Sequence, residues 1–237
     1  MLVNSWLKTI LNNLYPPVCL LCDAPGANGR DLCAGCLADL PHNHRCCLRC
    51  ALPLPITAPE GALCGRCARR PPPFECSHIP LRYTHPVDSL IGDLKFHARL
   101  VNGRLLAELL GDHLERNLPQ WPQRILPVPL HPRRLRERGF NQSLELARPL
   151  GRRFGIPVEA RAVMRTRFTP PQVGLKGKER QRNVRGVFAL RHALNADHVA
   201  ILDDVVTTGS TVAELTRLLQ KAGVPRVDVW AVARTET

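Results

Sequence analysis

The stretch VAILDDVVTTGSTVAEL, Val199 to Leu215, contains a strand, a loop and the start of a helix in one unbroken run. Its first four residues are apolar, as in a strand that is buried on both faces. Apolar residues then recur at helical spacing from Ser210, the expected helix cap, to Gly223, the expected end. A buried strand followed by a loop and a helix is the repeating unit of parallel α/β sheets.

The segments on either side of this stretch repeat the same order. Short apolar runs alternate with amphipathic runs, and no hairpin turn separates the apolar ones. The sequence therefore predicts an α/β fold, with a parallel sheet covered by helices on both faces. The expected strands are Arg124–Leu130, His198–Asp204 and Arg226–Arg234. The expected helices are Val101–Glu115, Asn141–Gly155 and Ser210–Gly223. A small strand-rich entry is expected over Ser77–Thr84 and Asp88–Phe96.

The charge of the chain points to anionic ligands. Lysine and arginine exceed aspartate and glutamate by 13 in 237 residues, and arginine crowds the stretch from Arg124 to Arg191. Such an excess attracts phosphates or nucleic acid but does not determine a fold. No signal peptide or apolar run of about 20 residues is visible, so a cytoplasmic protein without a membrane span is expected.

The cysteines predict a separate metal-binding module. All ten lie between Cys19 and Cys76, and eight form CxxC pairs. In a protein without a secretion signal, this spacing is typical of structural zinc sites rather than disulfides. Two CxxC turns supply four thiolates for a closed tetrahedral site. About two zinc ions are expected, on the ligands Cys19, Cys22, Cys33, Cys36, Cys47, Cys50, Cys64 and Cys67.

Two arrangements of these ligands remain open. Sequential pairing assigns the first four cysteines to one ion and the last four to the next, whereas a cross-braced arrangement joins the first pair with the third. Cys46 and Cys76 are expected to be free thiols. We predict a module over residues 1–76, held by metal because it has few large apolar side chains, and a second domain over residues 77–237. The prolines of ARRPPPFEC, Ala68–Cys76, predict a stiff linker between them.

Two adjacent acids, Asp203 and Asp204, follow the apolar run at the expected carboxyl end of a strand, where parallel sheets bind ligands. The loop after them leads into a helix N-terminus, which favours phosphate. Acids beside a phosphate site fit a sugar phosphate with two free hydroxyl groups. A solvated turn is the simpler alternative. A P-loop is disfavoured because no lysine follows Gly209, and a GxGxxG fingerprint is absent.

VAILDDVVTTGST resembles the phosphoribosyl pyrophosphate (PRPP) motif of type I phosphoribosyltransferases. Together with the four CxxC pairs, PVPLHPRRLRERGFNQS and RTRFTPPQVGLKGKERQRNVRGVF, it makes nearly the whole chain similar to the ComF/GntX family. The resemblance implies the type I phosphoribosyltransferase fold, with Asp203 and Asp204 on the ribose 2′ and 3′ hydroxyls. It also implies a 5′-phosphate cradle made of Thr207, Thr208, Gly209, Ser210 and Thr211.

Two further elements are expected to meet the pyrophosphate of PRPP. His131, Arg133 and Arg134 follow the strand in RILPVPL, where this fold carries its pyrophosphate loop, although a solvated basic surface is the alternative. The stretch from Thr166 to Phe188 is too long for an ordinary connection and is interpreted as a mobile lid. Its Lys176 and Arg182 are expected to act on the departing pyrophosphate, and are grouped with the two acids as catalytic.

The reaction implied by the resemblance is displacement at the anomeric carbon of PRPP, with Mg²⁺ as cofactor and a base or amine as acceptor. Leu2 follows Met1 where a glutaminase domain needs a cysteine, so glutamine is not expected to be the direct nitrogen donor. The segment Ser77–Leu100 has no recognisable base-binding signature.

Three functions fit these observations. The first is a phosphoribosyltransferase, and the second is a PRPP sensor without turnover. The third is an adaptor for DNA uptake, implied by the resemblance, whose partner would be single-stranded DNA or a competence helicase. These three functions do not exclude one another. The scarcity of aromatic residues argues against strong direct binding of DNA by base stacking.

Overall fold

The computed structural model describes residues 16–168 and 184–236. The chain forms two compact units, Met1–Pro41 and His42–Thr237. The first unit contains one short helix, α2 (Ala34–Ala38), in its described part. The second unit contains the sheet and also the helix α3 (Gly65–Arg69), which belongs to the later CxxC pairs. The domain boundary expected at residue 76 thus differs from the division between Pro41 and His42. That residues 1–76 fold as a separate domain stays a prediction.

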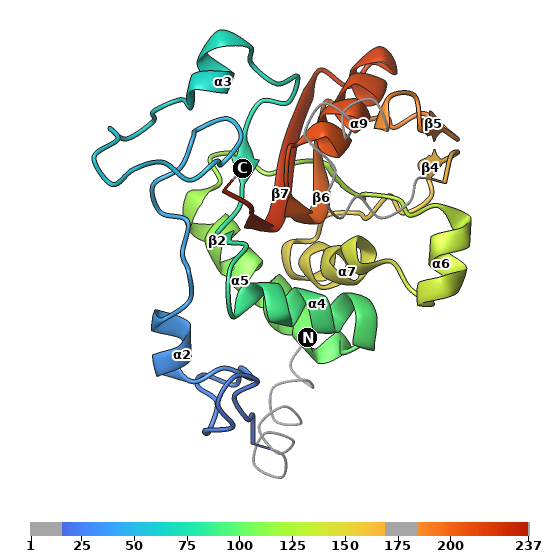
Figure 1. The fold of residues 1–237 in the computed structure, drawn as a ribbon. Helices are drawn as coiled ribbons and strands as arrows, with labels where there is room; N and C mark the ends of the chain where they lie inside the picture. The colour runs from blue at the N-terminus through green and yellow to red at the C-terminus, as the bar shows by residue number, and fades with distance from the viewer. Residues whose placement is uncertain (1–15, 169–183, 237) are drawn as a thin grey trace. The chain divides into compact units, whose positions relative to one another are not determined.

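A parallel sheet is the centre of the second unit (Figure 1). Strands β6 (His198–Val206) and β7 (Arg226–Arg234) pair along most of their length, from His198 opposite Arg226 to Val206 opposite Arg234. Strand β3 (Arg124–Pro127) pairs with the other edge of β6. Two short strands, β1 (Ser77–His78) and β2 (Leu81–Arg82), both pair with β7. Every pairing in this sheet is parallel, which confirms the fold class predicted from the apolar runs.

Helices cover both faces of the sheet. Successive side chains of a strand point to opposite faces, so a continuously apolar strand has apolar side chains to bury on each face. Val199 and Ile201 of β6 belong to the same buried cluster as Leu215 and Leu219 of α9 (Ser210–Lys221). On the other side, α5 (Leu100–Asn117) contacts β7, and α7 (Gln142–Phe154) contacts β6 and β3. The strands are accordingly buried on both faces, as their continuous apolar sequence predicts.

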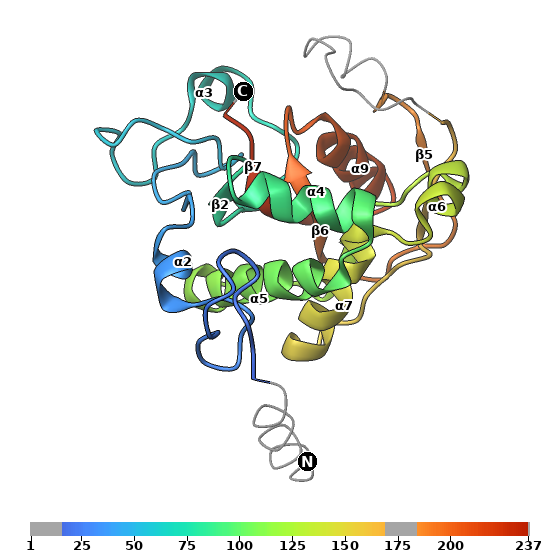
Figure 2. The same ribbon diagram turned by 60° about the horizontal axis from the view of Figure 1, so that its bottom comes forward.

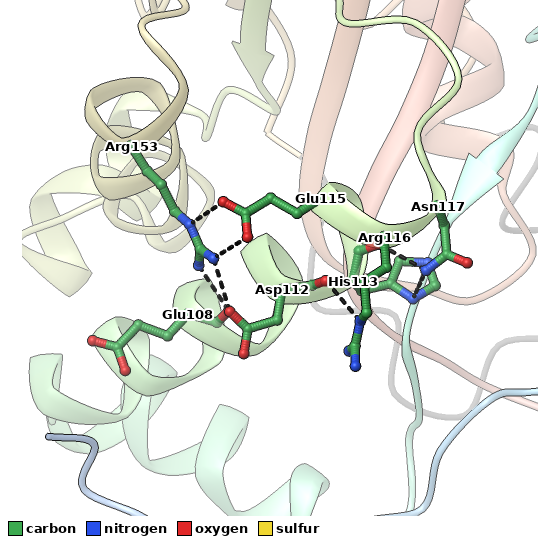
Figure 3. Close-up of polar contacts among 7 residues, drawn as sticks. All are labelled: Glu108, Asp112, His113, Glu115, Arg116, Asn117 and Arg153. Carbon is green, nitrogen blue, oxygen red and sulfur yellow. Dashed lines mark hydrogen bonds and ion pairs between the residues drawn. The ribbon is translucent and has the colours of Figure 1, made fainter. Parts of the chain in front are cut away.

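A charged clamp joins α5 to α7 (Figure 3). The guanidinium group of Arg153 donates to both carboxylate oxygens of Glu115, at 3.1 and 2.7 Å, and to Asp112 at 2.9 Å. Gly111 of α5 lies beneath this side chain, and a Cβ there would be 2.6 Å from Arg153 Nη1. The glycine therefore permits the close approach of the two helices. Figure 2 shows α5 beside α4 (Val87–His97), with which it also packs.

The structure corrects four expectations about local structure. Asp88–Phe96 lies within helix α4, because Val87, Leu90, Ile91 and Leu94 form one buried helical face. Helix α6 (Pro132–Arg138) replaces the loop expected after β3. Strands β4 (Val163–Arg165) and β5 (Phe188–Leu190) form a separate antiparallel pair. Gly209, not Ser210, is the N-cap of α9.

No helix in the described ranges has both the length and the apolar composition required to cross a bilayer.

Candidate functional site

Asp203 and Asp204 lie in β6, three and two residues before its last residue, Val206. Asp203 still pairs in register with Ala231 of β7. The acids therefore belong to the regular strand rather than to the turn after it, and Asp204 is only 4% exposed. This disfavours the alternative of a solvated turn.

Asp204 is held as a buried anion by a lysine from another helix. The ammonium group of Lys95, on α4, forms an ion pair with Asp204 Oδ2. The amide of Gln142, at the start of α7, contacts Asp204 Oδ1 at 3.5 Å. Burial opposes ionisation, but the positive charge of Lys95 and the hydrogen bonds from Lys95, Asp203 and Gln142 together outweigh it and lower the pKa of Asp204. The same ion pair raises the pKa of Lys95 against its own burial.

Asp203 is in the opposite electrostatic state. Burial, followed by the negative charge of Asp204, raises the pKa of Asp203 well above its ordinary value. Its Oδ1 accepts hydrogen bonds from Ser143 Oγ at 3.1 Å and from the Asp204 backbone N–H at 3.0 Å. The two neighbouring acids thus form an unequal pair, in which the pKa of Asp204 is lowered and that of Asp203 is raised.

The loop Thr207–Gly209 joins β6 to α9, and we call it the β6–α9 loop. Gly209 has φ of 76°, a left-handed conformation that suits glycine, and it starts α9 without a side-chain cap. Thr208 Oγ1 accepts from the Ser210 N–H at 3.3 Å and lies 2.8 Å from Ser210 Oγ. A pocket is lined here by Asp203, Thr207, Gly209, Ser210 and Thr211 among others. The structure thus places Asp203, hydroxyl groups and the N-terminus of α9 around one concavity, while Asp204 lies behind it in the ion pair with Lys95.

Two arginines hold the ends of this loop from within the second unit. Arg234, the last residue of β7, is fully buried and donates to the carbonyl of Val206 at 3.1 Å and to that of Cys50 at 3.0 Å. Arg66, on helix α3, donates to the carbonyl of Thr208 at 3.1 Å. The segment that carries the later CxxC pairs therefore contacts the backbone of the β6–α9 loop.

The basic residues after β3 lie on α6. His131 is the N-cap, and its Nδ1 accepts from the Arg133 N–H at 3.2 Å. Arg133 pairs with Glu137 at 2.9 Å, and its guanidinium group stacks 4.7 Å from the centre of the Phe168 ring. Arg134 is half-buried on the same short helix. Their role toward pyrophosphate stays a prediction, and Lys176 and Arg182 lie outside the described residues.

The eight paired cysteines form two groups in chain order, as sequential pairing requires. The first cysteine cluster is Cys19, Cys22, Cys33 and Cys36, and the second is Cys47, Cys50, Cys64 and Cys67. In each cluster, four thiol sulfurs lie within 4.8 Å of one another.

The distances within these clusters fit zinc. Four thiolates about 2.3 Å from one ion place neighbouring sulfurs about 3.8 Å apart. The Cys22 and Cys33 sulfurs are 3.7 Å apart, and those of Cys50 and Cys64 are 3.8 Å apart. Although burial opposes it, hydrogen bonds from backbone N–H groups lower the pKa of Cys19 to about 6 and that of Cys47 to about 7. Both clusters therefore fit structural zinc sites in which protein ligands would fill all four positions.

Sequence reasoning missed the residues that surround the two acids. Lys95 was assigned to a strand-rich segment, and nothing in its neighbourhood marks it as a partner of a residue more than 100 positions later. Gln142 and Ser143 were recognised only as a helix start. Arg138, which donates to Gln142 Oε1 at 2.6 Å, was grouped with the pyrophosphate loop. The helical spacing of Leu90, Ile91 and Leu94 was the one available signal for the helix that positions Lys95.

Comparisons with known proteins agree with this organisation. Residues 10–68 match the model of the double zinc ribbon domain. The chain is 39% identical to DNA utilization protein YhgH of Escherichia coli K12 over 93% of this chain and 98% of that protein. It is 35% identical to competence protein F of Haemophilus influenzae, over 86% and 90% of the two chains. A purine phosphoribosyltransferase from Pyrococcus horikoshii is similar over 57% of this chain and 84% of that one, with 18% identity and a TM-score of 0.35.

Proposed function

This chain belongs to the family of DNA utilization protein YhgH and competence protein F, and from that premise we propose that it is a PRPP-dependent phosphoribosyltransferase. The proposed reaction breaks the bond between the anomeric carbon of PRPP and pyrophosphate. It forms a bond from that carbon to the nitrogen of a base or amine, which loses a proton. The observation that carries the proposal is the pocket that Asp203 lines together with Thr207, Gly209, Ser210 and Thr211 at the start of α9.

The geometry of the pocket supports a sugar phosphate as ligand. Backbone N–H groups at the start of α9, together with the hydroxyls of Thr207, Thr208, Ser210 and Thr211, would bind the 5′-phosphate. Asp203 and Asp204 would accept from the ribose hydroxyls. Gly209 would let the backbone approach the phosphate closely.

The charges around the pair support binding of Mg²⁺ together with PRPP. Carboxylate and hydroxyl oxygens are the ligands that Mg²⁺ accepts, and Asp204 is ionised in a buried setting. When bound, Mg²⁺ would supply positive charge to the departing pyrophosphate. Asp203 and Asp204 would hold the sugar, and Lys95 would keep Asp204 charged while the ring develops positive character. His131, Arg133 and Arg134 would contact the pyrophosphate, as would Lys176 and Arg182.

A role in the use of DNA is the second part of the proposal. The names of the relatives associate them with DNA utilization and competence, and the net charge of +13 favours nucleic acid as a partner. The acceptor would then be a base or amine derived from DNA. A PRPP sensor or an adaptor for single-stranded DNA or a helicase would use the same pocket without turnover.

Calorimetry with Mg-PRPP tests the site. The variant Asp203→Asn is the sharper choice, because Asp203 lines the pocket and the Lys95–Asp204 ion pair stays intact. The double variant with Asp204→Asn is expected to lose binding at least roughly tenfold, which is about 1.4 kcal/mol. The single variant is expected to weaken binding while the protein unfolds at an unchanged temperature. Asp197→Asn is the control, since Asp197 is exposed before β6.

Unchanged PRPP affinity in folded acid variants would refute the site. Pyrophosphate release, measured with Mg-PRPP and a panel of bases and amines, separates the enzyme from the sensor. Turnover with one acceptor supports the transferase. PRPP binding without turnover across the panel, combined with PRPP-dependent association with single-stranded DNA, would favour the sensor or adaptor.

A further inference from the structure

A third group of metal-ligating side chains lies on β1 and β7, nearer the amino ends of the strands than Asp203. Cys76, His78 and Asp228 bring a thiol sulfur, an imidazole nitrogen and a carboxylate oxygen within 4.8 Å of one another. The Cys76 sulfur and His78 Nε2 are 3.3 Å apart. None of the three belongs to a CxxC pair or to the pocket at the β6–α9 loop.

The pairing of the strands produces this juxtaposition. Ser77 lies opposite Val229 and His78 opposite Trp230, so Cys76 and Asp228 are lateral neighbours. Cys76 and His78 are two residues apart, and alternate residues of a strand project to the same face. The three ligands therefore stand on one face of two hydrogen-bonded strands, and the Val229 N–H bonds the Cys76 carbonyl at 2.9 Å. A β framework of this kind fixes ligands more rigidly than a loop.

The surroundings of Asp228 resemble the support that metal-binding carboxylates receive. Asp228 is fully buried, and its Oδ2 is bonded by His198 Nε2 at 2.7 Å and by Arg226 at 3.2 Å. Its Oδ1 has no hydrogen-bond partner among the described residues. One oxygen is thus oriented by two partners, and the other is left without a partner in a place where an unpaired acceptor is costly.

A histidine of a neighbouring helix lies beside this group. His113 of α5 flanks His78, with ring centres 6.3 Å apart, and contacts Asn117 (Figure 3). A divalent cation would replace the thiol proton and screen two anionic groups from each other.

We propose that Cys76, His78 and Asp228 form a third zinc site, with three protein ligands and an open fourth position. Sulfur and nitrogen ligands at about 2.3 and 2.0–2.1 Å from zinc lie roughly 3.5 Å apart in a tetrahedral site, close to the distance between Cys76 and His78. The mixed ligand set distinguishes this site from both cysteine clusters. Cys76 and His78 are only partly buried, so water or a small anionic ligand can reach the fourth position.

Metal content and cobalt spectroscopy test the proposal on the full chain. Purified protein is expected to hold three zinc ions, and Cys76→Ser to hold two. Cys46→Ser is the matched control, because Cys46 is the other unpaired cysteine and is expected to leave three. Removal of zinc with a mild chelator is expected to empty the open site first, since the two clusters have no free position.

Cobalt added to that partly depleted protein is expected to give a thiolate-to-metal absorption band in the wild type and in Cys46→Ser. The band is expected to be absent in Cys76→Ser and to shift or weaken in His78→Gln, which is used because a variant of Asp228 would leave His198 and Arg226 without their buried partner. Thermal unfolding identifies any variant that does not fold. Equal metal content and equal cobalt bands in folded wild type and Cys76→Ser would overturn the proposal.

Discussion

The two cysteine clusters use the same ligands but differ in what surrounds them. In the first cluster, only Cys19 is buried and Cys22 is exposed. All four cysteines of the second cluster are buried, and they belong to the same apolar cluster as Leu126, Val199 and Leu215 of the sheet unit. One zinc site therefore organises its own small unit, whereas the other is part of the core that positions the β6–α9 loop.

The largest expected effect comes from breaking the second cluster. Zinc binding supplies about 10–16 kcal/mol in zinc-finger peptides, as much as the whole stability of a domain. Because Cys64 and Cys67 pack in the sheet core, Cys64→Ser is expected to destabilise the entire second unit. Thermal unfolding by circular dichroism is expected to show a main transition lowered by at least roughly 10 °C, or its loss.

Cys22→Ser is the matched variant in the first cluster. It is expected to release one zinc ion and to leave the main transition within about 2 °C of the wild type, since its unit is separate. Equal shifts for the two variants would show that the clusters are energetically equivalent. An unfolded second cluster with an intact sheet transition would instead support a folding boundary at residue 76.

Arg234 provides a second test of the difference between the two cysteine clusters. Its buried guanidinium group joins Cys50 of the second cluster to Val206 at the end of β6. Arg234→Met removes the donor of the Cys50 carbonyl, whereas the Val206 carbonyl keeps its hydrogen bond from the Thr235 N–H at 3.2 Å, so a loss of about 1–3 kcal/mol in the free energy of unfolding is expected. Urea denaturation measures it.

Arg82→Met provides the control for Arg234. Arg82 lies opposite Arg234 in the register of β2 and β7, but it is partly exposed and pairs with Glu236 at 3.9 Å. Its loss is expected to cost less than about 1 kcal/mol. A cost for Arg234→Met as small as that of Arg82→Met would mean that the link to the second cluster contributes nothing to stability.

The sequence predicted features that depend on neighbours along the chain. Each CxxC pair is a local turn, and the parallel strands are continuous apolar runs, so both could be recognised without the structure. The second cluster's place in the core could not, because its ties to the sheet join residues far apart in sequence. Arg234 and Cys50 are separated by 184 positions, and Arg66 and Thr208 by 142.

The same reason explains which parts of the candidate site were predicted. Asp203, Asp204 and the β6–α9 loop are consecutive, so their motif could be recognised in one stretch. Lys95 reaches Asp204 from a different helix, and an isolated lysine on an amphipathic helix resembles any solvated charge. The opposite pKa shifts of the two acids follow from burial and from Lys95, neither of which a motif contains.

The smallest expected effect concerns the hydrogen bond from Arg66 to the carbonyl of Thr208, which links helix α3 to the β6–α9 loop. Arg66 is exposed, so Arg66→Ala is expected to change the free energy of unfolding by no more than about 0.5 kcal/mol. One hydrogen bond contributes about 0.5–1.5 kcal/mol, and its loss would weaken Mg-PRPP binding roughly 2- to 10-fold. Amide hydrogen exchange over residues 207–211 is expected to become faster in the free protein, which tests the link independently of PRPP.

Arg69→Ala is the control that distinguishes the loss of this hydrogen bond from the loss of one positive charge on α3. Arg69 is also exposed on α3 and carries the same charge as Arg66. It is expected to leave the exchange of the β6–α9 loop unchanged and to reduce PRPP affinity only at low salt, where the field of an exposed cation is least screened. Equal effects of the two variants on exchange would contradict a specific contact. Faster loop exchange in Arg66→Ala alone, with global stability preserved, would mean that helix α3, which carries Cys67 of the second cluster, holds the loop through this one hydrogen bond.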